Sequence, residues 1–193
     1  YAAEEIADQF TAKLLEHTQR LRIGNGLEPD VDLGPMFSEA QREKTREHVA
    51  DALAKGASLL CGGREPEGRA FEKGFFYLPT VLDNVDHSMR IMREETFGPV
   101  APIMRFKTLE EAIALANDTE FGLAAYLFTR DLKTAIFASE RLEAGGIGVN
   151  VNNVVDIQAP FGGWKQSGLG RELGHYGLEA YLETKHIRLG LEM

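Results

Sequence analysis

The chain has 193 residues, enough for one domain with its own core, and its 44% hydrophobic and 26% charged residues are typical of a folded globular protein. The net charge of −9, from 21 basic and 30 acidic residues, argues against binding to nucleic acid or to an anionic membrane surface. No apolar run approaches the roughly 20 residues that a membrane-spanning helix needs. A single cysteine excludes an internal disulfide framework and favours a reducing compartment, so we expect a cytoplasmic protein.

Helices are predicted from the spacing of apolar residues and from capping signals. They cover residues 2–22, 38–55, 108–117, 131–143 and 172–181. In the first helix the residues that share one apolar face, which we expect to face the core, are Ile6, Phe10, Leu14 and Leu21. Capping-box pairs open the second and third helices, namely Ser38 with Gln41 and Thr108 with Glu111.

Short apolar runs between the helices predict strands. They cover residues 58–61, 75–82, 100–106, 124–128, 147–151 and 184–191. Residues 62–74, rich in glycine and charge, predict a surface loop. Strands that alternate with helices of this length indicate βαβ units, and therefore an α/β fold with a mainly parallel sheet and flanking helices. The one domain boundary that we expect lies near residue 181, before the last extended segment.

Residues 93–100, Arg-Glu-Glu-Thr-Phe-Gly-Pro-Val, place two adjacent carboxylates before an aromatic ring. The carboxylate of Glu95 can accept hydrogen bonds from two vicinal hydroxyls, as a ribose presents them. The ring of Phe97 can lie against a planar heterocycle. The alternative is a charged surface loop with Phe97 in the core, which is the default for both residue types.

Residues 159–172, Ala-Pro-Phe-Gly-Gly-Trp-Lys-Gln-Ser-Gly-Leu-Gly-Arg-Glu, predict a sharply turning loop before a helix. Such loops usually lie at the rim of a parallel sheet, where ligands bind, but a purely structural turn is an equal alternative. Gly168 and Gly170 do not start a phosphate-binding fingerprint, because the spacing to the next glycine is one residue too long and no strand leads into it.

These two stretches, with Phe-Gly-Leu-Ala-Ala at residues 121–125 between them, resemble the aldehyde dehydrogenase superfamily in order and spacing. The resemblance extends to residues 25–35 and 56–63 and spans about residues 5–190. The chain is similar to the C-terminal part of the family's catalytic domain, downstream of the cysteine nucleophile.

In this family a cysteine thiolate attacks the aldehyde, hydride passes to NAD or NADP, and a glutamate-activated water hydrolyses the thioester to the carboxylic acid. The resemblance places nucleophile, general base and Rossmann domain outside this chain, so we expect the chain alone to be inactive. It implies that Glu95 contacts the nicotinamide ribose and that Phe97 lies beside the ring. It also implies that Val155, Asp156 and Phe161 line the channel for the aldehyde substrate.

The resemblance divides the chain into a partial catalytic domain, residues 1–181, and an oligomerisation strand, residues 182–193. Apolar and polar residues alternate over residues 184–191, the period of a half-buried strand. We therefore expect this segment either to be disordered or to pair with a strand of another chain in a homo-oligomer, rather than to dock on its own core. The alternative is a tail that folds back onto its own chain.

Cys61 is not expected to be the nucleophile. It ends an apolar run, Arg64 is the only basic neighbour that could lower the pKa of its thiol, and the Gly-Gln-x-Cys context of the family's nucleophile is absent. We interpret Cys61 as a small structural hydrophobe. The five histidines are scattered without metal-ligand spacing, so no metal site is predicted.

Family members that oxidise succinic semialdehyde usually carry a hydroxyl residue where this chain has Asp156. A carboxylate there would repel the anionic tail of a substrate, so we expect a neutral or cationic aldehyde.

Two other functions are alternatives. One is a non-catalytic assembly module, and the other is a branch of the superfamily that transfers the acyl group to coenzyme A or reduces an acyl phosphate. A Gly-Gln-x-Cys strand just upstream of Tyr1 would exclude the module, and the two long motifs favour the hydrolysing branch.

Overall fold

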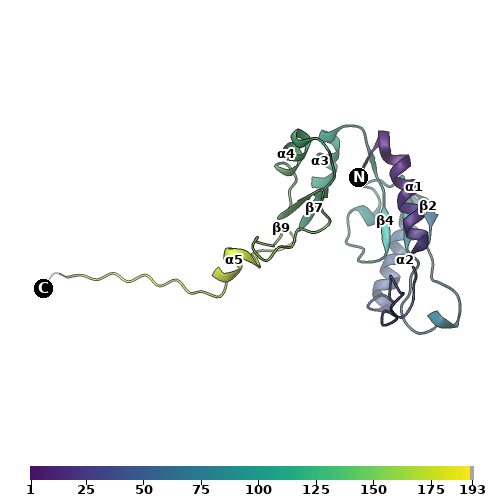
Figure 1. Ribbon diagram of the computed structural model, residues 1–193, viewed down its shortest axis with the longest axis horizontal. Helices are drawn as coiled ribbons and strands as arrows, with labels where there is room; N and C mark the ends of the chain where they lie inside the picture. The colour runs from purple at the N-terminus through teal and green to yellow at the C-terminus, as the bar shows by residue number, and fades with distance from the viewer. Residues whose placement is uncertain (192–193) are drawn as a thin grey trace. The chain divides into compact units, whose positions relative to one another are not determined.

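The computed structural model describes residues 1–191. The chain forms two compact units, Tyr1–Ala112 and Ile113–Met193, and helix α3 (Leu109–Asn117) runs across the boundary (Figure 1). Helices and short, mainly parallel strands alternate in both units, so the predicted α/β fold class is confirmed. Within the described part of the chain, no helix has the length and apolarity needed to cross a membrane.

Unit 1 contains a three-stranded sheet in the order β2–β3–β4 and a two-stranded pair, β1–β5. The strands are β1 (Ala2–Ala3), β2 (Ser58–Cys61), β3 (Thr80–Asp83), β4 (Val100–Pro102) and β5 (Arg105–Phe106). The helices are α1 (Glu4–Arg20) and α2 (Glu39–Ala54), with 3-10 turns η1 (Arg69–Phe71) and η2 (Arg90–Met92). Strand β3 is parallel to β4 and antiparallel to β2, and β1 is parallel to β5.

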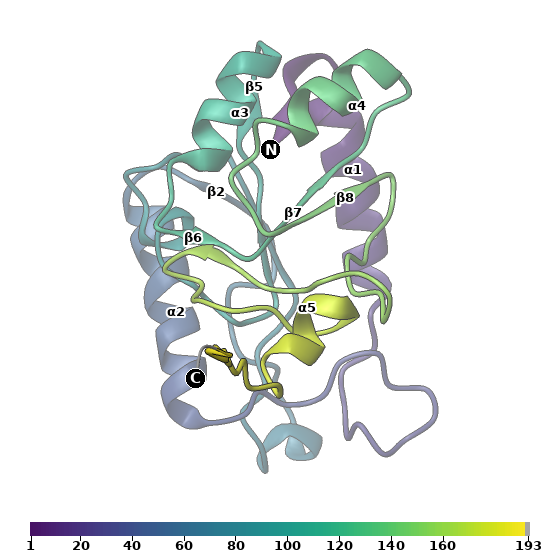
Figure 2. The ribbon, with the colours of Figure 1, turned by 90° about the vertical axis from the view of Figure 1, so that its left-hand side faces the viewer.

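The core of unit 1 lies on both faces of β3, because successive side chains of a strand point to opposite sides. Val81 packs with Ala7 of α1, whereas Leu82 packs with Val49 and Ala52 of α2. Figure 2 shows the two helices on either side of the strands. This double burial explains why every residue of β3 is buried, including the polar Thr80 and Asp83.

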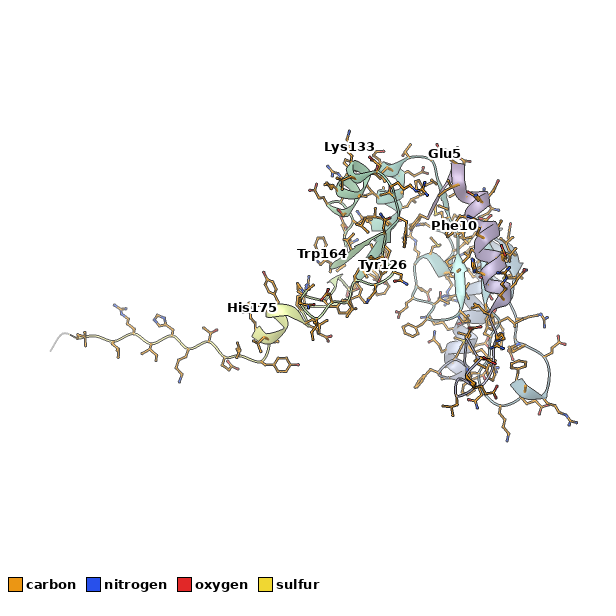
Figure 3. The ribbon with its side chains drawn as sticks, viewed as in Figure 1. Glu5, Phe10, Tyr126, Lys133, Trp164 and His175 are labelled. Atoms are coloured by element: carbon orange, nitrogen blue, oxygen red, sulfur yellow. The ribbon has the colours of Figure 1, made fainter. Side chains whose placement is uncertain are left out.

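Helix α1 buries a different face from the predicted one. Ala7 and Thr11 are buried, whereas Ile6 is 53% exposed and Phe10, labelled in Figure 3, is 47% exposed. Ile6 and Phe10 each directly precede one of these buried residues and so lie about 100° away from it around the helix axis. The small side chains of Ala7 and Thr11 line the buried face of α1, and only Leu14 of the predicted set packs against the core.

Helix α2 begins as its capping signal predicts: the Ser38 hydroxyl oxygen accepts the backbone N–H of Gln41 at 3.2 Å. It ends before Gly56, whose φ of +103° is a left-handed conformation that favours glycine. The buried face of this helix is partly polar, because Thr45 and His48 are fully buried beside Val49.

Unit 2 contains two strand pairs, β6–β9 and β7–β8. The strands are β6 (Phe121–Gly122), β7 (Ala124–Leu127), β8 (Gly146–Val149) and β9 (Trp164–Lys165), and the helices are α4 (Leu132–Ser139) and α5 (Gly174–Glu179). Strands β7 and β8 are parallel and are joined through α4, which contacts both. This is the βαβ unit that the sequence predicts.

Two predicted strands differ from the structure. The strand expected at residues 75–82 is limited to β3, and the one expected at 100–106 is divided into β4 and β5, which belong to different sheets. Pro79 and Pro102 lie at the two breaks. Because proline has no N–H to donate to a neighbouring strand, it limits regular pairing there.

Residues 182–191 belong to no helix or strand and are exposed, and residues 192 and 193 of the predicted oligomerisation strand lie outside the described residues. The described part of this segment is therefore not docked on its own unit.

Candidate functional site

The loop between η2 and β4 exposes both side chains that the sequence singles out there. Phe97 is 77% exposed, so the alternative that places it in the core is wrong. Its backbone has a φ of +47°, a conformation that non-glycine residues rarely adopt. Glu95 is exposed, and it forms no hydrogen bond or ion pair with any residue of the described part of the chain. The loop thus presents a free carboxylate and a free aromatic ring.

Helix α2 holds this loop through its polar inner face. The Gln41 amide nitrogen donates to the backbone carbonyl of Thr96 and, at 3.2 Å, to that of Phe97. A Cβ added at Gly98 would lie 2.5 Å from the hydroxyl oxygen of Thr45, so only glycine lets the chain approach the helix this closely. These contacts stabilise the uncommon backbone of Phe97.

Glu94, the neighbour of Glu95, has a different role. Its carboxylate accepts hydrogen bonds from the guanidinium of Arg90 at 2.9 and 3.2 Å and from Nε2 of His48 at 3.2 Å. The bond from Arg90, reinforced by the bond from His48, lowers the pKa of Glu94 to about 2. Of the two adjacent carboxylates, one is therefore fixed in an ion pair and the other is available to a ligand.

In unit 2, local side-chain turns shape the loop that carries the predicted channel residues. Asn153 Oδ1 accepts the N–H of Val155 at 2.9 Å, and Asp156 Oδ1 accepts that of Gln158 at 3.0 Å. Val155 and Asp156 are exposed as a result. Phe161 is half-buried, and its backbone pairs with Glu172 through hydrogen bonds of 2.8 and 2.7 Å.

The glycine-rich stretch that follows is largely occupied by internal contacts. A Cβ added at Gly145 would lie 1.7 Å from the carbonyl oxygen of Gly162. Lys165, next to the Trp164 labelled in Figure 3, donates to the carbonyls of Asn117 and Thr119 at 2.7 and 3.1 Å and pairs with Glu143 at 2.6 Å. The structural-turn alternative therefore accounts for these residues.

Comparison with known proteins identifies the family. The sequence profile described as "Aldehyde dehydrogenase family" matches residues 1–187. The chain belongs to the aldehyde dehydrogenase family. It is 46% identical, over 99% of its length, to succinate-semialdehyde dehydrogenase [NADP(+)] of Escherichia coli, and 46% identical, over 94%, to betaine aldehyde dehydrogenase of Mesorhizobium japonicum.

Solved aldehyde dehydrogenases share the fold. Betaine aldehyde dehydrogenase of Staphylococcus aureus in complex with NAD+ superimposes with a TM-score of 0.91 over 96% of this chain, at 42% identity. Succinate-semialdehyde dehydrogenase of Burkholderia pseudomallei superimposes with a TM-score of 0.87 over 93%, at 48% identity. The chain spans 37% and 36% of those two chains, and 39% and 37% of the two curated relatives. It thus corresponds to little more than a third of an aldehyde dehydrogenase.

Sequence reasoning missed the residues of this aldehyde dehydrogenase chain that support the Glu95 loop. In the sequence, His48 is one of five scattered histidines, and the spacing of Gln41 from Ser38 indicates only a helix start. Their spacing of seven residues, with Thr45 between them at four, places all three on one face of α2. This stripe of polar residues on one face of α2 was the signal in the sequence that could have indicated their role.

Proposed function

We propose that this chain is part of an NAD(P)-dependent aldehyde dehydrogenase that oxidises an aldehyde to a carboxylic acid through a cysteine thioester. NAD or NADP would supply the hydride acceptor. Within this chain, Glu95 would bind the two hydroxyls of the nicotinamide ribose and Phe97 would orient the nicotinamide ring. The supporting observation is that the loop exposes an unpaired carboxylate and a strained, exposed aromatic ring two residues apart.

The residues of the loop fit such a ligand chemically. An ionised carboxylate is an acceptor-only group with two oxygens, so it matches two neighbouring hydroxyl donors. An exposed aromatic face offers a stacking surface for a planar heterocycle. Because the fixed carboxylate of Glu94 leaves Glu95 unpaired, the ligand would not compete with an internal ion pair.

Replacing Glu95 by glutamine in the full-length protein tests this proposal. The loss of a charge-assisted hydrogen bond to the ribose is expected to weaken the binding of the correctly positioned cofactor by about 1.5–3 kcal/mol, or roughly 10- to 160-fold in kcat/KM. Steady-state kinetics with varied NAD(P)+ and aldehyde would measure it. The matched control is Glu5→Gln, the same change at an exposed position of α1, which should leave kinetics unchanged. Unaltered kinetics for Glu95→Gln would instead make Glu95 a solvated loop residue.

We further propose that Val155, Asp156 and Phe161 line the substrate channel and that Asp156 selects against anionic aldehydes. The relatives are named for both succinate semialdehyde and betaine aldehyde, so their names do not choose between substrates. The exposed carboxylate of Asp156 supports a neutral or cationic aldehyde, because it would repel a carboxylate tail.

Asp156→Ser is expected to raise kcat/KM for succinic semialdehyde, relative to a neutral aldehyde of similar length, by about fivefold, since a like-charge repulsion of about 1 kcal/mol is removed. Asp156→Asn should give the same shift, because it removes the charge but keeps the oxygen that accepts the Gln158 N–H. A wild-type enzyme that markedly prefers succinic semialdehyde would contradict the assignment of Asp156.

The isolated chain is expected to oxidise no aldehyde and to self-associate. It holds no Gly-Gln-x-Cys segment to supply the nucleophile. Without the Rossmann domain that the family resemblance places outside this chain, the loop of Glu95 and Phe97 should bind NAD+ with a dissociation constant above about 1 mM, equivalent to −4 kcal/mol. We propose that residues 182–193 pair with another copy, because the exposed segment with one apolar row has no partner strand in its own chain as far as residue 191. Titration calorimetry and sedimentation velocity measure the two properties. Tight NAD+ binding, or a strictly monomeric chain with residues 184–191 protected from amide exchange, would oppose these expectations.

A further inference from the structure

One buried side chain holds the residues on both sides of Glu95. His48, fully buried on α2, approaches Glu94 Oε2 with Nε2 at 3.2 Å and Thr96 Oγ1 with Nδ1 at 3.0 Å. A single rigid ring thus connects the preceding and the following residue of the loop to the helix. Among the described residues, no other side chain forms a hydrogen bond with the side chains of both neighbours.

The direction of the two hydrogen bonds follows from the acceptor. A carboxylate can only accept, so Nε2 of His48 carries the proton that is donated to Glu94. With the proton on Nε2, Nδ1 of the neutral ring is an acceptor, and the Thr96 hydroxyl donates a hydrogen bond to it. The threonine hydroxyl is consequently oriented toward the helix and fixes the backbone that leads from Glu95 to Phe97.

We infer that His48 is a positioning residue for Glu95, holding the carboxylate of Glu95 in one direction through its bonds to Glu94 and Thr96. This inference rests on the proposed function of Glu95. A merely space-filling role does not require an imidazole, because burying its two nitrogens is unfavourable unless both find partners, and the next two buried positions of α2, Val49 and Ala52, are apolar. Both nitrogens do have partners, and both partners flank the proposed ligand-binding residue.

The inference predicts an effect on turnover more than on cofactor affinity. The contacts that hold the remainder of the cofactor would lie on other parts of the enzyme, whereas the direction of Glu95 determines how the nicotinamide ring meets the substrate. Small errors in that alignment slow a reaction strongly. The loss of one of the two buried hydrogen bonds of His48 is expected to lower kcat about tenfold while changing KM for NAD(P)+ less than about threefold.

The test compares variants of the full-length protein. Thr96→Val removes the hydroxyl at constant volume, and Thr96→Ser keeps it. His48→Gln can place its amide nitrogen where Nε2 donates to Glu94, but it then has no acceptor at the position of Nδ1 for Thr96. His17→Gln is the same change at an exposed position of α1. The readouts are kcat, KM for the cofactor, the kinetic isotope effect with an aldehyde deuterated at the reacting carbon, and the melting temperature.

We expect Thr96→Val and His48→Gln each to lower kcat about tenfold and to raise the isotope effect. The double variant should be no slower than either single variant, because both changes remove the same hydrogen bond between His48 and Thr96. Thr96→Ser and His17→Gln should stay within about twofold of wild type. If Glu95→Gln lowers kcat/KM but Thr96→Val and His48→Gln do not lower kcat, the positioning role is overturned and the role of Glu95 stands. If Glu95→Gln itself has no effect, both are overturned. Equal losses of turnover and melting temperature for Thr96→Val and Thr96→Ser would also overturn the positioning role.

Discussion

Replacing Leu82 by alanine is expected to lower the free energy of unfolding of this chain by about 3–4 kcal/mol. Leu82 has no exposed surface and packs between β3 and the inner face of α2. The substitution removes buried methyl groups and leaves a cavity, because the strand is enclosed on both faces and cannot collapse easily. A loss of this size is a large share of the 5–15 kcal/mol typical of a folded domain.

Urea unfolding of the purified chain, followed by circular dichroism, measures this change. The matched control is Leu59→Ala, because Leu59 is the β2 residue opposite Leu82 but is 41% exposed. It should lower stability by less than about 1 kcal/mol. Equal losses for the two leucines would show that Leu82 is not packed more tightly against α2 than its exposed neighbour Leu59, contrary to the core described above.

Replacing Gly145 by alanine is the second change with a large expected effect, a destabilisation of about 3 kcal/mol, the upper end of the usual cost of overpacking. An added Cβ would lie 1.7 Å from the carbonyl oxygen of Gly162, a backbone atom that cannot move without shifting the glycine-rich loop. The left-handed region is not involved, since the φ of Gly145 is not positive. The effect would therefore be purely steric.

Thermal unfolding of the chain, with tryptophan fluorescence as the local probe, would report this change, because Trp164 lies two residues after Gly162. Gly190→Ala is the control in the same unit, since a Cβ there meets no atom within 4 Å. A stable Gly145→Ala variant with unchanged fluorescence would be inconsistent with the close approach of the two segments.

The sequence predicts those features of the fold that depend on local signals. Ser38 caps α2 and Thr108 accepts the N–H of Glu111 at the start of α3, as their spacing indicates. The buried face of α1 was predicted wrongly, because apolar periodicity favours the large Ile6 and Phe10 over the small Ala7 that faces the sheet. Periodicity measures hydrophobicity and not the distance at which a helix can approach a strand.

The candidate site was predictable only in part. The pairing of Glu95 with Phe97 was noticed from their chemistry, and their assignment to a cofactor came from the family resemblance. The polar stripe on α2 is visible in the sequence, but the partners of His48 were not predictable, since Glu94 and Thr96 lie 46 and 48 residues away in sequence. No local pattern indicates which buried helix position meets a loop at that distance.

A crystal structure of the full-length protein with NAD(P)+ bound would test the role of Glu95 directly. We expect both oxygens of the Glu95 carboxylate to lie about 2.5–3.0 Å from the two hydroxyls of the nicotinamide ribose, with the Phe97 ring in contact with the nicotinamide. His48 should still bridge Glu94 and Thr96 in that complex. A bound cofactor whose ribose hydroxyls contact other residues, with Glu95 left in solvent, would contradict it.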